Sequence, residues 1–391
     1  MSESDKTRWG LVSTTGVLTG LGHGFVAFAV SALLKPVALD LDTGRGAVST
    51  AIGLGRLVSG VSSPFVGRIT DAAGPRWIVV AGMVITAIGL MMLGLVQNEA
   101  GLYFAWSLVL SLGVAAAFTV ALDKLVVATV KGKRGMALAV RFSVAAIIST
   151  LLVPIITILV ETFGWRTTCF IWGGFILLLL PIPLLFFSQD RLAGPQKADA
   201  VPLENAPKAL PDSDGLREVI RQPAFWVIAC AFTAQAAVST GLAIHLVPLM
   251  TDYGLDPILA GTLFGGMILL SVPVRLLSGY AADRIHARFL PLLLGGLLVL
   301  EGIAIGSFAV MPGFVTMLIV IAALGVSAGA PTLLVLVLCG ELFGERRFAT
   351  VQGSLMFLQV PGTMIAPIAA GYAYDMTGSY VGVVAAFALL L

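Results

Sequence analysis

The stretch that decides the fold is Gly-Arg-Ile-Thr-Asp-Ala-Ala-Gly-Pro-Arg at residues 67–76, because a counterpart recurs in the second half of the chain. The counterpart is Gly-Tyr-Ala-Ala-Asp-Arg-Ile-His-Ala-Arg at residues 279–288. In both, Asp follows Gly by four residues, Arg follows Asp by five, and two long apolar runs are joined. Glycine permits a tight turn, and the Asp can cap a helix or pair with Arg. We predict an internal repeat with a conformational gate on one face, made of Gly67, Asp71, Arg76, Gly279, Asp283 and Arg288.

Composition points to a membrane protein. The 391 residues are 58% apolar and 11% charged, with a mean hydropathy of +1.00. A soluble protein carries about 25% charged residues. These figures exclude a soluble fold, a disordered chain, a coiled coil and a secreted disulfide scaffold, and a net charge of +2 does not indicate nucleic-acid binding. We expect the cysteines to be small buried residues rather than disulfides or metal ligands; they are Cys169, Cys230 and Cys339.

The apolar runs are long enough to cross a membrane as helices, since a span needs about 20 residues. We predict an all-α membrane protein of twelve spans in two six-helix bundles, residues 1–187 and 223–391, joined by a Pro-rich and charged linker at 188–222. The last run is short, so we expect the natural chain to continue. The predicted spans are 9–34, 47–66, 77–96, 101–127, 136–160, 167–187, 224–251, 257–280, 289–310, 313–338, 348–372 and 379–391.

The distribution of Lys and Arg predicts the orientation, because cytoplasmic loops are enriched in these residues. The loops on the side of the N-terminus and linker hold sixteen of them. The opposite loops hold only Lys35, Arg45 and Arg166. We therefore expect both termini and the linker to be cytoplasmic, in a multi-pass protein of the inner (cell) membrane, with no cleavable signal peptide at the start.

Ionisable residues inside the predicted spans are candidates for function, since each costs free energy unless it is paired or hydrated. Four fixed cations oppose two acids, and a surplus of positive charge favours an anionic ligand. Two histidines without an acidic cluster do not make a metal site, so we expect no metal and no cofactor. The ionisable residues inside the predicted spans are His23, Arg56, Asp123, Lys124, Arg141, His245, Arg275 and Glu301.

Finer motifs indicate a family. Beside the repeat, the chain carries Gly164-Trp165-Arg166, His245-Leu-Val-Pro248, Thr251-Asp252-Tyr-Gly254, Glu341-Leu-Phe-Gly344 and Tyr374-Asp375-Met-Thr-Gly378-Ser-Tyr380. Across its full length the chain resembles the major facilitator superfamily, and these motifs are similar to its monocarboxylate transporter and oxalate/formate antiporter branch in bacterial form. The resemblance implies two bundles related by pseudo-two-fold symmetry, with the substrate between them.

Candidate substrate contacts follow from the chemistry and from this resemblance. The fork of a guanidinium matches a carboxylate, and Arg275 resembles the substrate-binding arginine of the branch. Arg56 is either a second anion contact or the partner of an acid on another helix. His23 and His245 either gate the site and carry a proton or are satisfied between helices. The remaining residues expected to line the cavity include Phe28, Phe118 and Gln359.

Proton-coupling candidates are the acids and their neighbours. Asp123 and Arg141 lie at similar depth because a short loop joins their helices, and the pair is either a switch that protonation breaks or a permanent bridge. Lys124 can reach toward the cytoplasmic edge. Glu301 either takes part in coupling or is a protonated acid bonded to a neighbouring helix.

Three departures from the branch leave the coupling open. Phe28 stands where animal monocarboxylate transporters have a lysine in the first helix, and Ser271 replaces an aspartate one turn before the arginine. The eleventh span has Gln352 and Gln359 but no lysine.

The predicted function is transport and not enzyme catalysis, because no nucleophile, phosphate-binding or zinc motif is present. We expect a monomeric secondary transporter of small organic anions, most simply a proton-coupled symporter of a lactate-like monocarboxylate that works by alternating access. Anion exchange is the alternative within this class, and a non-transporting membrane sensor on the same fold is the alternative outside it.

Overall fold

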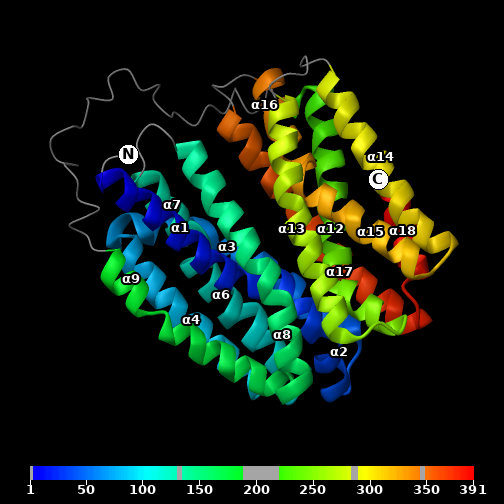
Figure 1. Cartoon of the computed structure of the whole chain (residues 1–391), viewed down its shortest axis with the longest axis horizontal. Helices are drawn as coiled ribbons and strands as arrows, with labels where there is room; N and C mark the ends of the chain where they lie inside the picture. Colours follow the sequence, from blue (N-terminus) through cyan, green and yellow to red (C-terminus); the bar gives the residue numbers. More distant parts are fainter. Residues whose placement is uncertain (1–2, 130–133, 188–219, 283–288, 344–347) are drawn as a thin grey trace.

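The computed structural model describes residues 3–129, 134–187, 220–282, 289–343 and 348–391, and every regular element in these ranges is a helix. The helices form two groups that lie side by side, one from residues 3–187 and one from residues 220–391 (Figure 1). Each group has its own apolar core. The core of the first group takes a single residue, Ile244, from the second, and the main core of the second takes only Val153 from the first.

The first group contains five helical rods. Its elements are α1 (Glu3–Gly24), η1 (Phe25–Ala29), α2 (Val30–Asp40), α3 (Arg45–Ala73), α4 (Pro75–Gly94), α5 (Glu99–Leu102), η2 (Tyr103–Leu110), α6 (Ser111–Val114), η3 (Ala115–Val120), α7 (Ala121–Thr129), α8 (Arg134–Leu178) and α9 (Pro181–Phe186). In chain order the rods are α1 to α2, α3, α4, α5 to α7, and α8 with α9; the first, fourth and fifth bend or change pitch along their length. The η elements are π-helical turns within the first and fourth rods.

The second group has the same kind of helices. Its elements are α12 (Pro223–Asp252), α13 (Pro257–Ala282), α14 (Leu290–Val310), α15 (Phe314–Gly329), α16 (Pro331–Phe343), α17 (Phe348–Thr377) and α18 (Val381–Leu390).

Helix covers each of the twelve predicted runs in the ranges described, with two differences in continuity. α8 contains the fifth run and the first part of the sixth, which continues in α9, and it bends at Gly164, whose φ of +79° ends one helix and lets the next begin. The tenth run is divided between α15 and α16 at Ala330, because Pro331 lacks the N–H that a continuous helix needs. Among the described residues, eight helices are long and apolar enough to cross a membrane, and two shorter apolar helices accompany them. Twelve crossings therefore remain a prediction, as does the linker at 188–222, most of which lies outside the described residues.

The first of the repeated loops has the turn that its sequence predicts. Gly74 ends α3 with a φ of +83°, its N–H donates to the carbonyl of Thr70 at 3.1 Å, and Pro75 opens α4. Lys124 donates to the same carbonyl at 3.1 Å, which places a cation at the negative end of a helix. The ring of Trp77 lies 5.2 Å from the Arg76 guanidinium. The side chain of Asp71 and residues 283–288 lie outside what the structure describes, so the gate stays a prediction.

The outer surface is apolar, as helices facing lipid require. Large apolar side chains stand exposed there, among them Val310, Met376 and Leu389. The cysteine prediction is wrong at one position. Cys169 and Cys339 are buried, but Cys230 is exposed on α12, where lipid rather than protein packing accommodates an apolar thiol.

The two groups touch at one end of the molecule. We call this the Arg45 end; it carries residues 40–45, 252–257 and 377–381, opposite the linker end with Phe187 and Ile220. There α3 packs against α17 and α8 packs against α13. A Cβ on Gly371 would lie 2.8 Å from the carbonyl of Arg45, so only glycine allows the α3–α17 approach. In Figure 1 the groups diverge from this contact toward the end with α7 and α16.

Close helix packing inside the first group gives a test of the fold. A Cβ on Gly82 of α4 would lie 2.5 Å from the backbone nitrogen of Ala117, so Gly82→Leu forces the helices apart. We expect a loss of about 1–3 kcal/mol of folding stability, seen as a lower melting temperature in detergent. Gly296→Leu is the matched control, because nothing lies within 4 Å of a Cβ there. Equal melting temperatures for the two variants would contradict this packing.

Candidate functional site

Arg45 locks the two groups together. Its guanidinium binds Asp252 through both terminal nitrogens, at 2.6 and 3.0 Å. The backbone N–H groups of Arg45 and Gly46 donate to the carboxylate of Asp375 at 2.8 and 2.7 Å. The ring of Tyr374 lies under the guanidinium, 3.7 Å from its carbon. We call this set the Arg45 latch; it joins the start of α3 to the ends of α12 and α17.

His245 belongs to the same closed junction, which corrects its prediction as a substrate contact. The side chain is 1% exposed. Arg45 donates to the Tyr380 hydroxyl, which can therefore donate to Nδ1 of His245, 2.9 Å away. Nε2 is left to donate to the carbonyl of Pro367 at 2.9 Å, and Ser49 lies 3.2 Å from it. Both ring nitrogens of His245 are thus hydrogen-bonded between helices, which is the second of the two roles that the sequence left open for this residue.

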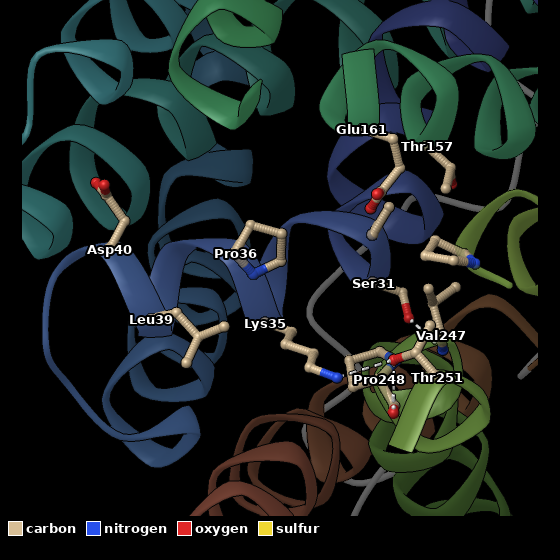
Figure 2. A pocket seen from close by; sticks show the side chains of 12 residues that line it. Ser31, Lys35, Pro36, Leu39, Asp40, Thr157, Glu161, Val247, Pro248 and Thr251 are labelled. Atoms are coloured by element: carbon tan, nitrogen blue, oxygen red, sulfur yellow. Dashed lines mark hydrogen bonds between the residues drawn. The ribbon is translucent and has the colours of Figure 1, made fainter. Parts of the chain in front are cut away.

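Each cation of the loops at the Arg45 end has an acidic partner. Lys35 binds Asp252 at 2.9 Å, Arg45 binds the same carboxylate, and Arg166 binds Asp40 at 2.7 Å. Lys35, Asp40 and Thr251 also line a pocket of about 540 Å³ between α2, α8, α12 and α13 (Figure 2). None of the predicted substrate residues lines this pocket, so it is distinct from the site that the sequence predicts.

A polar cluster lies inside the first group around Arg141. The pairing of Arg141 with Asp123 is present, with Arg141 1% and Asp123 43% exposed at the side chain. Arg141 also donates to the hydroxyl of Thr19 at 2.8 Å and the carbonyl of Phe118 at 2.9 Å. The cluster therefore ties the first, fourth and fifth rods together, and only its carboxylate is accessible to solvent.

Phe118 does not line a cavity as predicted. Its ring is fully buried, and a Cβ on Gly22 would collide with it, so α1 lies directly on the ring. The π-helical segment η3 contains this residue, and π-helical turns often accompany functional sites because they reorient backbone groups. Phe118 contributes its backbone carbonyl to the cluster rather than its ring.

His23 and Arg56 lie near this cluster without partners of their own among the described residues. His23 is half-buried and within electrostatic reach of both Arg56 and Arg141. The Nε of Arg56 is buried and makes no hydrogen bond. Arg56 follows Ser49 by seven residues, which places both on one face of α3. Ser49 touches the second group, so Arg56 lies on the face toward that group, two turns nearer the linker end.

Arg275 has the matching position in the second group. It follows Phe264 by eleven residues, three helical turns along one face of α13, and Phe264 packs edge-on against Phe28 of the first group. Arg275 is half-buried, and its guanidinium donates to the carbonyl of Ala328 at 3.2 Å. No acidic partner of Arg275 occurs in the part of the chain that the structure describes. Arg275 and Arg56 thus lie on the facing sides of the two groups, beyond their contact at the Arg45 end.

The remaining candidates take other positions. Phe28 is half-buried at the contact between the groups. Gln359 is half-buried and donates to the sulfur of Met356 in its own helix, at 3.2 Å. Glu301 is 4% exposed inside the second group, away from Asp123 and Arg141. The side chain of Gln352 lies outside what the structure describes.

The sequence analysis missed the latch, although two signals were present. Asp252, Tyr374, Asp375 and Tyr380 all stand in the motifs that carry the family resemblance. Arg45 is one of only three cations on its side of the membrane, and a rare loop cation is a candidate for an ion pair.

Breaking the latch should open the Arg45 end. With Cys169, Cys230 and Cys339 replaced by Ala, a Ser49→Cys reporter is buried and should react slowly with a maleimide in detergent. Asp252→Asn combined with Asp375→Asn should raise the labelling rate severalfold, because both contacts of α3 with the second group are weakened. Asp40→Asn is the control, since Asp40 pairs with Arg166 inside the first group. Unchanged labelling in the double variant would show that the latch does not hold this end closed.

Comparisons with known proteins agree with this arrangement. The chain is 25% identical to monocarboxylate transporter 13 of Rattus norvegicus over 368 residues, covering 93% of this chain and 80% of that one. It is 25% identical to monocarboxylate transporter 11 of Mus musculus over 383 residues, covering 95% and 82%. A bacterial homologue of the human lysosomal transporter Spinster, solved in an inward-facing, unoccupied conformation, has a TM-score of 0.76 at 15% identity, with 96% and 84% covered.

The nucleoside transporter NupG has the same fold, with a TM-score of 0.72 at 13% identity, covering 98% of this chain and 96% of that one. The model of the Major Facilitator Superfamily matches residues 16–367. The chain therefore belongs to the major facilitator superfamily of membrane transporters and is a homologue of the monocarboxylate transporters.

Proposed function

We propose that this protein is a proton-coupled symporter of small monocarboxylates such as lactate, and that Arg275 binds the substrate carboxylate between the two groups of helices. The substrate class is supported by the curated relatives, which are named as monocarboxylate transporters. The alternatives to be tested against symport are anion exchange and a sensor that does not transport.

The observation that carries the proposal is a pair of arginines without acidic partners among the described residues. Arg275 and Arg56 lie on the facing sides of the two groups, in helices surrounded by apolar side chains. A guanidinium binds a carboxylate through two parallel hydrogen bonds, and such charge-assisted bonds are strong where water is scarce. A small carboxylate supplies the missing negative charge at the point where the groups face each other.

We further propose that residues 1–187 and 223–391 are the two bundles of a twelve-span monomer in the inner membrane. The excess of Lys and Arg at the linker end supports a cytoplasmic location for the linker and both termini. With this orientation the Arg45 latch closes the outer side, and the substrate site opens to the cytoplasm. Transport then requires the latch to break and contacts to form at the linker end. For that inner contact we propose the repeated loops, with Gly67, Asp71, Arg76, Gly279, Asp283 and Arg288.

Proton coupling is proposed for the Arg141 cluster. The carboxylate of Asp123 is partly exposed, whereas Arg141 is buried and keeps two further acceptors, Thr19 and the Phe118 carbonyl. Protonation of Asp123 removes one ion pair without leaving Arg141 unbonded. The freed positive charge then favours an anion at the neighbouring His23 and Arg56, so proton and carboxylate bind together. Lys124, bonded to Thr70, then serves to position this rod.

Uptake of labelled lactate into proteoliposomes tests the function as a whole. Symport predicts accumulation driven by an inward proton gradient and its loss on adding an uncoupler. Exchange predicts uptake only against internal substrate, whatever the proton gradient. Absence of both would identify a protein without transport.

The role of Arg275 is tested by Arg275→Lys, which keeps the charge and removes the fork. Loss of one charge-assisted hydrogen bond should lower kcat/KM for lactate by about tenfold or more. Arg221→Lys, on the exposed start of the second group, is the control and should transport normally. Wild-type kinetics in Arg275→Lys would remove this residue from the substrate site.

The role of Asp123 is tested by Asp123→Asn. We expect accumulation driven by a proton gradient to be abolished while exchange of labelled for unlabelled substrate continues, since exchange needs no net proton movement. Asp256→Asn, a change at an exposed residue that caps the start of α13, controls for general damage. Survival of proton-driven accumulation would make the Asp123–Arg141 pair purely structural.

A further inference from the structure

A second buried acid lies outside the site described so far. Glu301 is in the middle of α14, 4% exposed, and neither of its carboxyl oxygens has a hydrogen bond of ordinary geometry within the described residues. An ionised carboxylate without partners in an apolar interior is strongly disfavoured. The residue must therefore hold a proton or another cation for at least part of the transport cycle.

The surroundings of Glu301 are polar but uncharged. Ser327 of α15 interacts with the carboxyl group and is 2% exposed. Its hydroxyl accepts from the amide of Gln235 at 2.7 Å and lies 3.3 Å from the hydroxyl of Ser239, both on α12. We call Glu301, Ser327, Gln235 and Ser239 the Glu301 cluster. The hydroxyl of Ser327 thus connects the region of Glu301 to two polar side chains of α12.

No fixed cation neutralises this acid in the described part of the chain. α14 packs against α15, α16 and α18. The sequences of α15 and α18 contain no ionisable side chain, and α16 contains Cys339 and Glu341, of which the Glu341 side chain is not described. On α12, which supplies Gln235, the ionisable side chains are Cys230, His245 and Asp252; Cys230 is exposed and the other two belong to the Arg45 end. A proton is the simplest cation that fits.

Ser327 can report the state of the acid because a hydroxyl has one hydrogen and two lone pairs. When Glu301 carries a proton, its O–H can donate to Ser327, whose own hydrogen then points to Ser239. When Glu301 is ionised, Ser327 turns its hydrogen to the carboxylate, and its second lone pair can then accept from the Ser239 hydroxyl. Proton binding therefore reverses the donor and acceptor roles within the Glu301 cluster.

The other side of the same segment holds Arg275. Ala328, directly after Ser327, gives its carbonyl to the Arg275 guanidinium at 3.2 Å. α15 and α13 are in close backbone contact here, since a Cβ on Gly329 would lie 2.6 Å from the carbonyl of Ser271 and 3.0 Å from the nitrogen of Arg275. α15 ends at Gly329, directly after these residues. Residues 327–329 are thus bonded to the Glu301 cluster on one side and to Arg275 on the other.

We propose that Glu301 is a proton-binding site of the second group, and that its protonation is linked to carboxylate binding at Arg275 through residues 327–329. The proton comes from the aqueous phase, forms an O–H bond on the carboxyl group, and returns to water when the substrate leaves. The linkage rests on the proposed role of Arg275, whereas the proton site itself does not.

Infrared spectroscopy of the full chain in lipid tests the proton site without any substrate. Difference spectra between acidic and alkaline pH should contain the carbonyl stretch of a buried carboxylic acid, and Glu301→Gln should remove it. Glu99→Gln, at an exposed acid, is the control and should leave the band in place. A spectrum unchanged by Glu301→Gln overturns the site, and so does a band that responds to Na⁺ at constant pH, which would identify a sodium site.

Lactate titrations of the same proteins test the linkage. In the wild type, affinity should fall as the pH rises; Glu301→Gln, which mimics the protonated acid, should bind lactate more tightly than the wild type at alkaline pH and keep only the pH dependence that Asp123 confers. Ser327→Ala should keep the infrared band and lose the pH dependence that Glu301 confers. Wild-type pH dependence in Glu301→Gln overturns the linkage. Failure of the wild type to bind any carboxylate would instead contradict the proposed function, while the infrared result would still decide the proton site.

Discussion

Positive charge enclosed by apolar helices is the constraint on which this structure depends, because hydrocarbon offers no solvent to neutralise it. Four cations of the described chain have an acidic partner. At the Arg45 end, Lys35, Arg45 and Arg166 are bound to aspartates. Deeper in the first group, Arg141 binds Asp123.

Two arginines inside the predicted spans have no acidic partner among the described residues, and they lie where the two groups face each other. Arg56 and Arg275 each lie on the helix face that contacts the other group near the Arg45 end. Along that face both residues lie nearer the linker end than the contact does. A carrier needs its unsatisfied charge at such a place, since a ligand bound between the groups interacts with both and can bias their relative position. The latch and the unpaired arginines are thus two uses of one chemistry, guanidinium with carboxylate. In one the carboxylate belongs to the chain, and in the other we propose that the substrate supplies it.

Much of the fold could be predicted from the sequence, because run length and glycine placement act locally. The turns at Gly74 and Gly164 fall between predicted spans, where a left-handed glycine ends a helix. The Asp123–Arg141 pair could be predicted for the same reason, since a short loop brings the two residues to equal depth. The break between α15 and α16 has a local cause as well, in Pro331, but a continuous apolar run conceals it.

The site was less predictable because helix rotation and distant contacts decide it. Whether Phe118 offers its ring or its carbonyl depends on how α1 lies across it, and no spacing in the fourth rod encodes that. His245 is satisfied by Tyr380, Pro367 and Ser49, which come from three other parts of the chain. The π-helical turns have no sequence signature. The sequence can therefore predict a surplus of positive charge inside the spans, but only the packing of the helices shows which of these charges are already paired.

The most direct measurement is a calorimetric titration of the purified wild-type protein with lactate and with lactamide, its uncharged amide of nearly the same shape. If the enclosed arginines need a carboxylate, lactate binds and raises the melting temperature, while lactamide does neither at the same concentration. Equal binding of the two compounds, or binding of lactamide alone, would contradict the claim that an anionic substrate neutralises Arg275.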